Sequence, residues 1–245
     1  MPVSFAYSRR QIIALARPPL LALGLAGFGF PLLPRPLRAE DAPAPAGDAK
    51  AAAPADAKAA PDLMAPGPLP DIAMGATDAP VTIVEYASMT CPHCAHFHTD
   101  VFPTLKSRYI DTGKVRFMLR EFPLDPLAAA GFMVARCAGP EKRDAIVDLL
   151  YRQQKTWAVA SDPAKALLGV LKQAGFTQES FDACLKDSKL YDAVLKTREI
   201  ASESFKVEST PTFFINGKKE PGAIPLDQLD KILEPFFNAP ARKLD

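Results

Sequence analysis

The stretch that decides the fold of this chain is Val81-Thr82-Ile83-Val84-Glu85-Tyr86-Ala87-Ser88-Met89-Thr90-Cys91-Pro92-His93-Cys94. Its first part, residues 81–87, is apolar on both alternations, which predicts a central strand buried on both faces. Apolar residues at helical spacing follow its last part, at Phe97, Val101, Leu105 and Tyr109. The stretch therefore predicts a strand, a turn and a helix whose first residue is a thiol.

A thiol at the start of a helix has particular chemistry. The first N–H groups of a helix have no intrahelical partner, and the helix dipole at that end favours negative charge. A cysteine placed there is stabilised as the thiolate, which is the reactive form of the side chain. We therefore expect Cys91 to ionise more easily than an ordinary cysteine.

Length and composition exclude several classes of protein. The chain has 245 residues, and residues 1–70 do not resemble a globular sequence, so the remainder fits one core with an insertion. Its 29 basic and 28 acidic residues are interspersed and give a net charge of +1, so we expect no nucleic-acid partner. Four cysteines are too few for a disulfide scaffold, and all four lie between residues 91 and 184.

Residues 1–39 have the features of an export signal peptide, with cleavage expected after Ala39. Arginines come first, and an apolar run over residues 20–33 follows. Ser8-Arg9-Arg10-Gln11-Ile12-Ile13 resembles the twin-arginine export motif, and an ordinary secretory signal that contains Arg-Arg is the alternative. An uncleaved anchor is not expected, because the apolar run is shorter than the roughly 20 residues needed to span a bilayer.

Residues 40–70 predict a disordered linker rich in alanine and proline. They contain seven prolines, and Asp-Ala-Lys-Ala-Ala occurs at residues 48–52 and again at 56–60. Such a composition supplies too little apolar surface for a packed core. We therefore place the folded domain at residues 71–245.

The first half of the domain continues with a strand and several helices. The helix that starts at Cys91 should extend to about Ile110 and kink at Pro103. Residues 114–120 alternate polar and apolar side chains and predict a second strand. From about residue 125 to 205 the patterns are helical only, with glycine and proline as stops and starts. The helices predicted in this insertion cover residues 127–137, 143–154, 163–174, 178–186 and 189–204.

Strand patterns return after the insertion. Residues 212–215 predict a strand, and Asn216-Gly217 is a strong signal for a hairpin turn. Residues 218–224 should form an edge strand, because the segment contains Pro221. A last helix is expected from Pro225, with Leu226, Leu229, Leu233 and Phe236 on one face. The order of the elements predicts an α/β fold.

The two cysteines and their context resemble a known family. A C-x-x-C pair at a strand-to-helix junction is typical of a redox site, although the pair by itself also fits half of a zinc site. With Ser209-Thr210-Pro211-Thr212 before a strand far downstream, the sequence resembles the thioredoxin superfamily, and within it the exported DsbA-like disulfide oxidoreductases of the alphaproteobacterial branch. The resemblance covers residues 71 to about 238. It implies a thioredoxin fold with an all-helical insertion over about residues 125–205.

The resemblance also implies roles for single residues. Cys91 is expected to be the exposed nucleophile, and Cys94 the shielded thiol that resolves the mixed disulfide. His93 is expected to favour the Cys91 thiolate, which predicts an oxidant; a solvated turn histidine is the alternative. Glu85 matches a buried acid that moves the proton of Cys94, and the alternative is an acid exposed at a sheet edge.

Two further residues are expected at the substrate side of the dithiol. Pro211 matches the cis-proline of the family, which faces the dithiol and binds an extended substrate peptide; a trans proline at a strand start is the alternative. Thr210 precedes it, where family members that shuffle disulfides often carry threonine and the best-known oxidase carries an aliphatic residue. Thr210 therefore leaves isomerase activity open.

Cys137 and Cys184 lie in two different helices of the predicted insertion. In an oxidising compartment an even pair within one compact segment favours a structural disulfide, as in similar members of the branch, and two buried free thiols are the alternative. Such a bridge would be structural, stabilising the fold by about 4 kcal/mol on the chain-entropy estimate, or could tune the Cys91–Cys94 pair from a distance.

These residues together predict a periplasmic thiol:disulfide oxidoreductase that introduces disulfides into exported proteins. The resemblance implies a membrane-bound DsbB-like reoxidant, exported proteins with free thiols as substrates, a monomer, and no cofactor or metal besides the Cys91–Cys94 disulfide. An isomerase or reductase on the same scaffold is an alternative. Two others are a zinc or copper chaperone using Cys91, Cys94 and His98, and a holdase that only binds peptides beside Pro211. Trp157 and Phe236-Phe237 are expected in the core.

Overall fold

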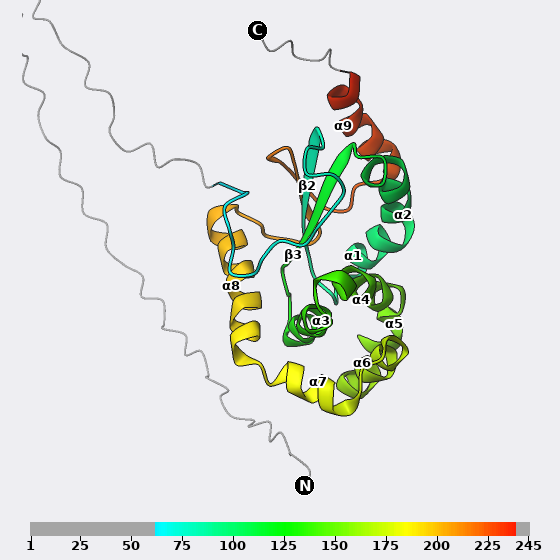
Figure 1. Cartoon of the computed structure of the whole chain (residues 1–245), viewed down its shortest axis with the longest axis vertical. Coiled ribbons are helices and arrows are strands. Elements are labelled where there is room, and N and C mark those ends of the chain that lie inside the picture. Colours follow the sequence, from blue (N-terminus) through cyan, green and yellow to red (C-terminus); the bar gives the residue numbers. More distant parts are fainter. Residues whose placement is uncertain (1–61, 239–245) are drawn as a thin grey trace, which may run out of the picture. The chain divides into compact units, whose positions relative to one another are not determined.

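The computed structural model of this chain describes residues 62–238, which form a five-stranded sheet with helices on both faces (Figure 1). The strand order is β1-β3-β2-β4-β5. β2 and β3 run parallel, and the other neighbouring pairs are antiparallel. The strands are β1 (Ala73–Met74), β2 (Val81–Ala87), β3 (Val115–Glu121), β4 (Thr212–Ile215) and β5 (Lys218–Pro221).

The register of the central strands positions the two halves of the site. β4 pairs antiparallel with β2, so Thr212 at the start of β4 lies opposite Tyr86 near the end of β2. The loop after β2 leads to Cys91, and the residue before Thr212 is Pro211. Segments about 120 residues apart in sequence therefore meet at one end of the sheet.

Each face of the sheet carries its own apolar core. Ile83, Phe117 and Phe213 point to the larger core, which includes the dithiol helix and most of the insertion. Val84 and Met118, their neighbours in the strands, point to a smaller core on the other face. Both alternations of β2 are therefore buried, as its sequence predicts.

The helix after Cys91 is interrupted where the sequence predicts one kinked helix. It consists of α1 (Pro92–His96), the π-helical η1 (Phe97–Val101), α2 (Phe102–Leu105) and the π-helical η2 (Lys106–Ile110). Pro103 has no N–H to continue the regular ladder, and the N–H of Phe102 bonds to the carbonyl of Phe97, five residues back. The predicted apolar stripe is still buried as far as Leu105.

All five helices predicted for the insertion are present, with shifted ends. They are α3 (Pro126–Cys137), α4 (Pro140–Arg152), α6 (Pro163–Leu171), continued by η3 (Lys172–Ala174), α7 (Gln178–Leu185) and α8 (Ser188–Ser204). α4 starts three residues early because Pro140 suits the first helical position. A short extra helix, α5 (Gln154–Trp157), follows it, and Trp157 is fully buried as expected.

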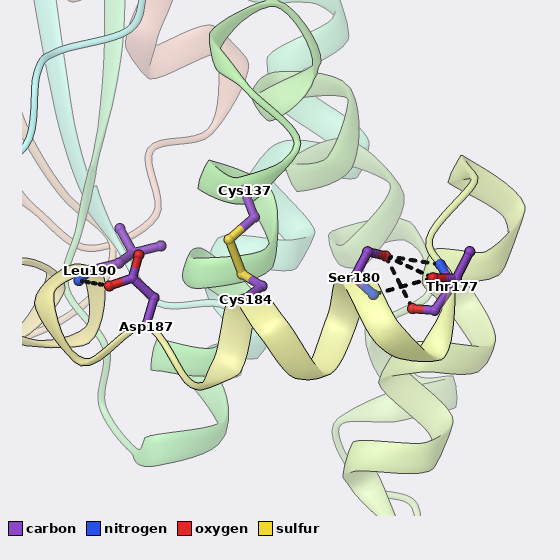
Figure 2. Close-up of a disulfide and its surroundings, with 6 residues drawn as sticks. All are labelled: Cys137, Thr177, Ser180, Cys184, Asp187 and Leu190. Atoms are coloured by element: carbon purple, nitrogen blue, oxygen red, sulfur yellow. Dashed lines mark hydrogen bonds between the residues drawn. A yellow bond between two sulfur atoms is a disulfide. The ribbon is translucent and has the colours of Figure 1, made fainter.

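A disulfide joins Cys137 at the end of α3 to Cys184 in α7 (Figure 2). The S–S distance is 2.07 Å and the two Cα atoms are 6.1 Å apart. α7 begins with a capping box between Thr177 and Ser180, and the carboxylate of Asp187 accepts from the N–H of Leu190 at the start of α8 (Figure 2). The bridge holds the end of α3 against α7, and the caps set where α7 and α8 begin.

In the C-terminal helix, α9 (Leu226–Asn238), the buried face differs from the predicted one at a single position. Leu229 and Leu233 are buried, but Phe236 is 39% exposed. Phe237 packs instead, with its ring stacked on Tyr109 at 5.5 Å between centroids. Leu229, Leu233 and Phe237 are four residues apart and therefore lie on one face of the helix, whereas Phe236 lies beside that face. The prediction that Phe236 is buried is therefore wrong.

Residues 62–71 lie against the sheet, so part of the predicted linker contacts the domain. The guanidinium of Arg120 donates to the carboxylate of Asp71 and to the carbonyl of Leu63. Arg136 donates to the carbonyl of Pro70. The predicted signal peptide, residues 1–39, and residues 40–61 of the predicted linker lie outside the described residues. Within residues 62–238 no helix is both long enough and apolar enough to cross a membrane.

Candidate functional site

Cys91 directly precedes α1, so its side chain lies at the start of a helix as the sequence predicts. Both Cys91 and Cys94 are free thiols in this structure. Cys91 is only 5% exposed, whereas the sequence predicts that this nucleophile is exposed. The structure therefore corrects that expectation. The cause is the segment before β4, since Sγ of Cys91 donates to the carbonyl of Thr210 at 3.3 Å.

The Thr210–Pro211 peptide bond is cis. Both residues are buried beside Cys91, and the hydroxyl of Thr210 has no hydrogen-bond partner within the described part of the chain. The side chain of Thr210 is one of the groups that lower the pKa of Cys91.

The surroundings of Cys91 favour its thiolate. Its pKa is lowered from 9.0 to about 5, chiefly because the thiol of Cys94 donates a hydrogen bond to it. Burial acts in the opposite direction. The side chain of Thr210 and the backbone N–H groups of Cys94 and His93 lower the pKa further. At neutral pH Cys91 is therefore mainly ionised.

Cys94 has the opposite environment. It is fully buried, and burial raises its pKa well above the ordinary value. The hydrogen bond to Cys91 and the negative charge of Glu85 raise it further. A proton therefore stays on Cys94 while Cys91 is a thiolate.

His93 stabilises the Cys91 thiolate through its backbone N–H, whereas the sequence predicts that its imidazole does so. Its side chain is exposed, and its N–H is one of the groups that lower the pKa of Cys91. Within the described residues the imidazole of His93 makes no hydrogen bond or ion pair of its own. The position of the residue after Pro92, at the helix start, is enough to supply that N–H.

Glu85 is fully buried in β2, as its apolar neighbours predict. Its Oε2 atom is hydrogen-bonded to Nε2 of His98 at 2.8 Å, and its Oε1 atom has no partner among the described residues. The ring of Tyr151 from α4 stacks on the imidazole of His98, with centroids 4.5 Å apart. The sequence does not reveal that His98 is the partner of Glu85. In the sequence, His98 is considered only as a possible metal ligand.

Gln154 is a second residue that the sequence analysis missed. It is buried at the start of α5, and its Nε2 atom donates to the carbonyl of Met89 at 2.8 Å and to that of Cys91 at 3.0 Å. A helix of the insertion thus holds the loop that carries the dithiol. A polar residue at the end of an amphipathic helical pattern is a weak signal, so the sequence alone does not single out Gln154.

The described residues contain no group of three or more histidine, cysteine or acidic side chains that could hold a metal ion. His98, the third ligand of the metal-chaperone alternative, is bonded to Glu85. Nothing in the geometry of the site therefore favours that alternative.

Comparisons with known proteins agree with this arrangement. A family model described as Thioredoxin matches residues 69–235. A Rickettsia bellii protein named "Putative protein-disulfide oxidoreductase" is 34% identical over 148 residues, which cover 60% of this chain and 57% of that protein. The "Probable disulfide bond formation protein D" of Bacillus anthracis is 30% identical over 154 residues, covering 59% of this chain and 69% of that protein. This chain thus matches little more than half the length of the Rickettsia relative.

Among solved structures, the crystal structure of alpha-DsbA1 from Wolbachia pipientis is similar with a TM-score of 0.64 and 30% sequence identity. The match covers 70% of this chain and 93% of the Wolbachia chain. The likeness therefore includes both the sheet and the helical insertion.

Proposed function

Since this chain belongs to the thioredoxin family, we propose that it exchanges disulfides with protein thiols through Cys91 and Cys94. The observation that carries the proposal is the difference between the two thiols, one with a pKa of about 5 and one with a raised pKa. A thiol that is ionised at neutral pH is a good leaving group in disulfide exchange. The names of the relatives are consistent with this activity.

The reaction that we infer uses the dithiol in its disulfide form. A substrate thiolate attacks Sγ of Cys91, the bond to Sγ of Cys94 breaks, and Cys94 takes up a proton. A second substrate thiolate then attacks the substrate sulfur of the mixed disulfide, and Cys91 leaves as a thiolate. The substrate gains a disulfide and loses two electrons, which reduce the dithiol of this chain.

The direction of exchange that we propose is oxidation of the substrate. Each unit by which the pKa of Cys91 lies below that of an ordinary thiol stabilises the reduced dithiol by about 1.4 kcal/mol, or about 30 mV of oxidising power. An extended substrate peptide would bind along the backbone of Thr210 and the cis Pro211, which places a substrate sulfur within reach of Sγ of Cys91. We further propose that the chain acts in the periplasm on exported proteins and that a membrane-bound DsbB-like protein reoxidises it.

An isomerase on the same scaffold is the second candidate, and Thr210 before the cis-proline favours it. An isomerase normally presents two dithiols to one substrate through an oligomer, whereas we expect a monomer. Sedimentation of the full chain would separate the two. A stable oligomer that depends on residues 40–75 would favour the isomerase.

The activity is tested with a reduced, unfolded protein that has two cysteines and the oxidised full chain in slight excess. We expect the substrate thiols to disappear as the substrate disulfide forms. The Cys91→Ser and Cys94→Ser variants should both fail to oxidise the substrate, because neither can form the Cys91–Cys94 disulfide. Offered the substrate in its disulfide form, Cys91 of the Cys94→Ser variant should attack that disulfide, release one substrate sulfur as a thiolate and stay joined to the other as a mixed disulfide. Substrate oxidation by Cys91→Ser at the rate of the unchanged chain would contradict the proposal. A holdase activity would persist in both variants.

A further inference from the structure

We propose that His98 is a positioning residue for the dithiol reaction, because it holds Glu85 as a carboxylate whose free oxygen exchanges a proton with Cys94. The inference rests on the proposed disulfide exchange and adds the partner of the buried acid to it. Three observations carry it: the bond between His98 and Glu85, the free oxygen Oε1 of Glu85, and the rings that enclose the imidazole of His98.

The first observation is the isolation of the pair. Glu85 is fully buried, and the side chain of His98 is 4% exposed. In the described part of the chain His98 provides the only ion pair or side-chain hydrogen bond of the Glu85 carboxylate. A carboxylate buried without a partner takes up a proton, so a charge partner is needed to keep it ionised.

The second observation is how the two oxygens of Glu85 are used. His98 occupies Oε2, whereas Oε1 is buried and has no partner among the described residues. The charge of Glu85 acts on Cys94, so the two groups lie within electrostatic reach of each other. Oε1 is therefore the oxygen left to accept a proton from Cys94 or to return one.

The third observation is the aromatic enclosure of the imidazole of His98. Tyr151 stacks on it at 4.5 Å with an interplanar angle of 19°, and the centroid of Phe102 lies at 5.0 Å. Phe97 and Phe117 approach with their rings near perpendicular to it. Aromatic faces favour a cation beside them, and the four rings fix the orientation of the imidazole.

Few other titratable groups face His98. Glu85 approaches from β2 and Tyr151 from α4, while Phe97, Phe102 and Phe117 are uncharged. The pKa of Tyr151 is well above its ordinary value because the residue is buried, so it stays neutral. Arg143, also on α4, bonds to Asp144 and lies 3.5 Å from Glu121. The imidazole is thus the group that responds to the charge of Glu85.

The proton balance follows the bond changes. When Cys94 attacks the mixed disulfide on Cys91, its thiol proton passes to Glu85, the bond between the two enzyme sulfurs forms, and the bound sulfur leaves with the electron pair. Glu85 then releases this proton to solvent, and when the enzyme disulfide is opened by a thiolate it passes a proton from solvent to Sγ of Cys94. The carboxylate left behind is then paired with His98, as in the reduced state seen here.

The test uses the reduced full chain with excess oxidised glutathione, quenched with acid at a series of pH values and analysed by mass after alkylation. The first step forms a mixed disulfide on Cys91 and does not use Cys94, so it is an internal control. The second step is the attack by Cys94. In His98→Gln, which keeps a donor but has no charge, we expect the second step to slow about 10- to 100-fold at neutral pH.

The pH profile separates this role from a structural one. With His98→Gln the second step should recover as pH rises, because Glu85 then loses its proton without help. A defect of packing would slow it by the same factor at every pH. In a Glu85→Gln background, His98→Gln should cause no further loss at neutral pH. His96→Gln, which changes an exposed histidine in the same run of helix, should behave like the unchanged chain.

Three results would overturn the inference while leaving the proposed function intact: an unchanged second step in His98→Gln, an equal loss at all pH values, or independent losses in the double variant. A chain that forms no mixed disulfide at Cys91 would instead contradict the proposed function. If His98→Gln does not fold, the ring-nitrogen NMR signals of His98 in the unchanged chain decide. They should change between the oxidised and the reduced protein, and identical signals in both states would refute the role of His98.

Discussion

The pKa of Cys91 is about 5, while that of Cys94 is raised well above its ordinary value, although two residues separate them. Because folding lowers the pKa of Cys91, its thiolate stabilises the reduced protein at pH values above the pKa of a free cysteine. That contribution is lost as pH falls through about 5. Reduction of the disulfide therefore takes up one proton above pH 5, on Cys94, and two protons below it.

The first prediction concerns the reduction potential. We expect it to change by about 30 mV per pH unit between pH 5 and 8 and by about 59 mV per unit below pH 5, because the number of protons taken up doubles. Equilibration with a glutathione buffer measures the potential, and ultraviolet absorbance of the thiolate gives the pKa of Cys91. A slope of 59 mV per unit up to pH 8 would mean that Cys91 titrates as an ordinary thiol.

At the scale of elements, the helical insertion is part of the site. α5 approaches the loop between β2 and α1, and Gln154 bonds two of its carbonyls. The hydroxyl of Tyr151 in α4 donates to a third carbonyl, that of Ser88, at 3.3 Å. The loop that carries Cys91 is therefore held from the insertion as well as from the sheet.

The second prediction is that Gln154→Met lowers the free energy of unfolding by about 2 kcal/mol, because a buried carbonyl loses its partner. The rate of alkylation of Cys91 should change as well, since the thiol is carried by the same loop. Gln153→Met is the matched control, because the side chain of Gln153 bonds to that of Gln173 at the surface and its loss should cost less than about 0.5 kcal/mol. Equal stabilities of the two variants in urea would remove Gln154 from the support of the loop.

At the scale of the whole described domain, the Cys137–Cys184 disulfide is a long-range covalent link. Its sequence separation of 47 residues encloses α4, α5 and α6. A cross-link of this span reduces the conformational entropy of the unfolded chain more than a short one does. Cys137 is the last residue of α3, whose other end begins beside the dithiol loop, where Asp125 accepts from the hydroxyl of Thr90.

The third prediction follows from that link. Replacing both residues, Cys137→Ser with Cys184→Ser, should lower the free energy of unfolding by about 4 kcal/mol in urea without reductant. Formation of the mixed disulfide at Cys91 under native conditions should keep its rate. Unchanged stability of the double variant would show that the bridge does not constrain the unfolded chain.

The local parts of this protein were readable from its sequence. The apolar run of β2, the cysteine pair at the helix start, the Asn216-Gly217 turn and the glycine and proline boundaries of the insertion depend on neighbouring residues only. The physical reason is that strand and helix preferences, turns and caps act within a few positions. The fold class and the thiol chemistry followed from them.

The tertiary structure alone decided which distant groups meet. It paired Glu85 with His98 and brought Gln154 to the carbonyl of Cys91, 63 residues away. It covered Cys91 with Thr210, 119 residues away, and placed Phe237 instead of Phe236 on Tyr109. These contacts depend on how the sheet and helices pack in three dimensions, which no pattern along one segment contains. The ionisation of Cys91 thus begins with a local helix start and is completed by residues that only the fold brings together.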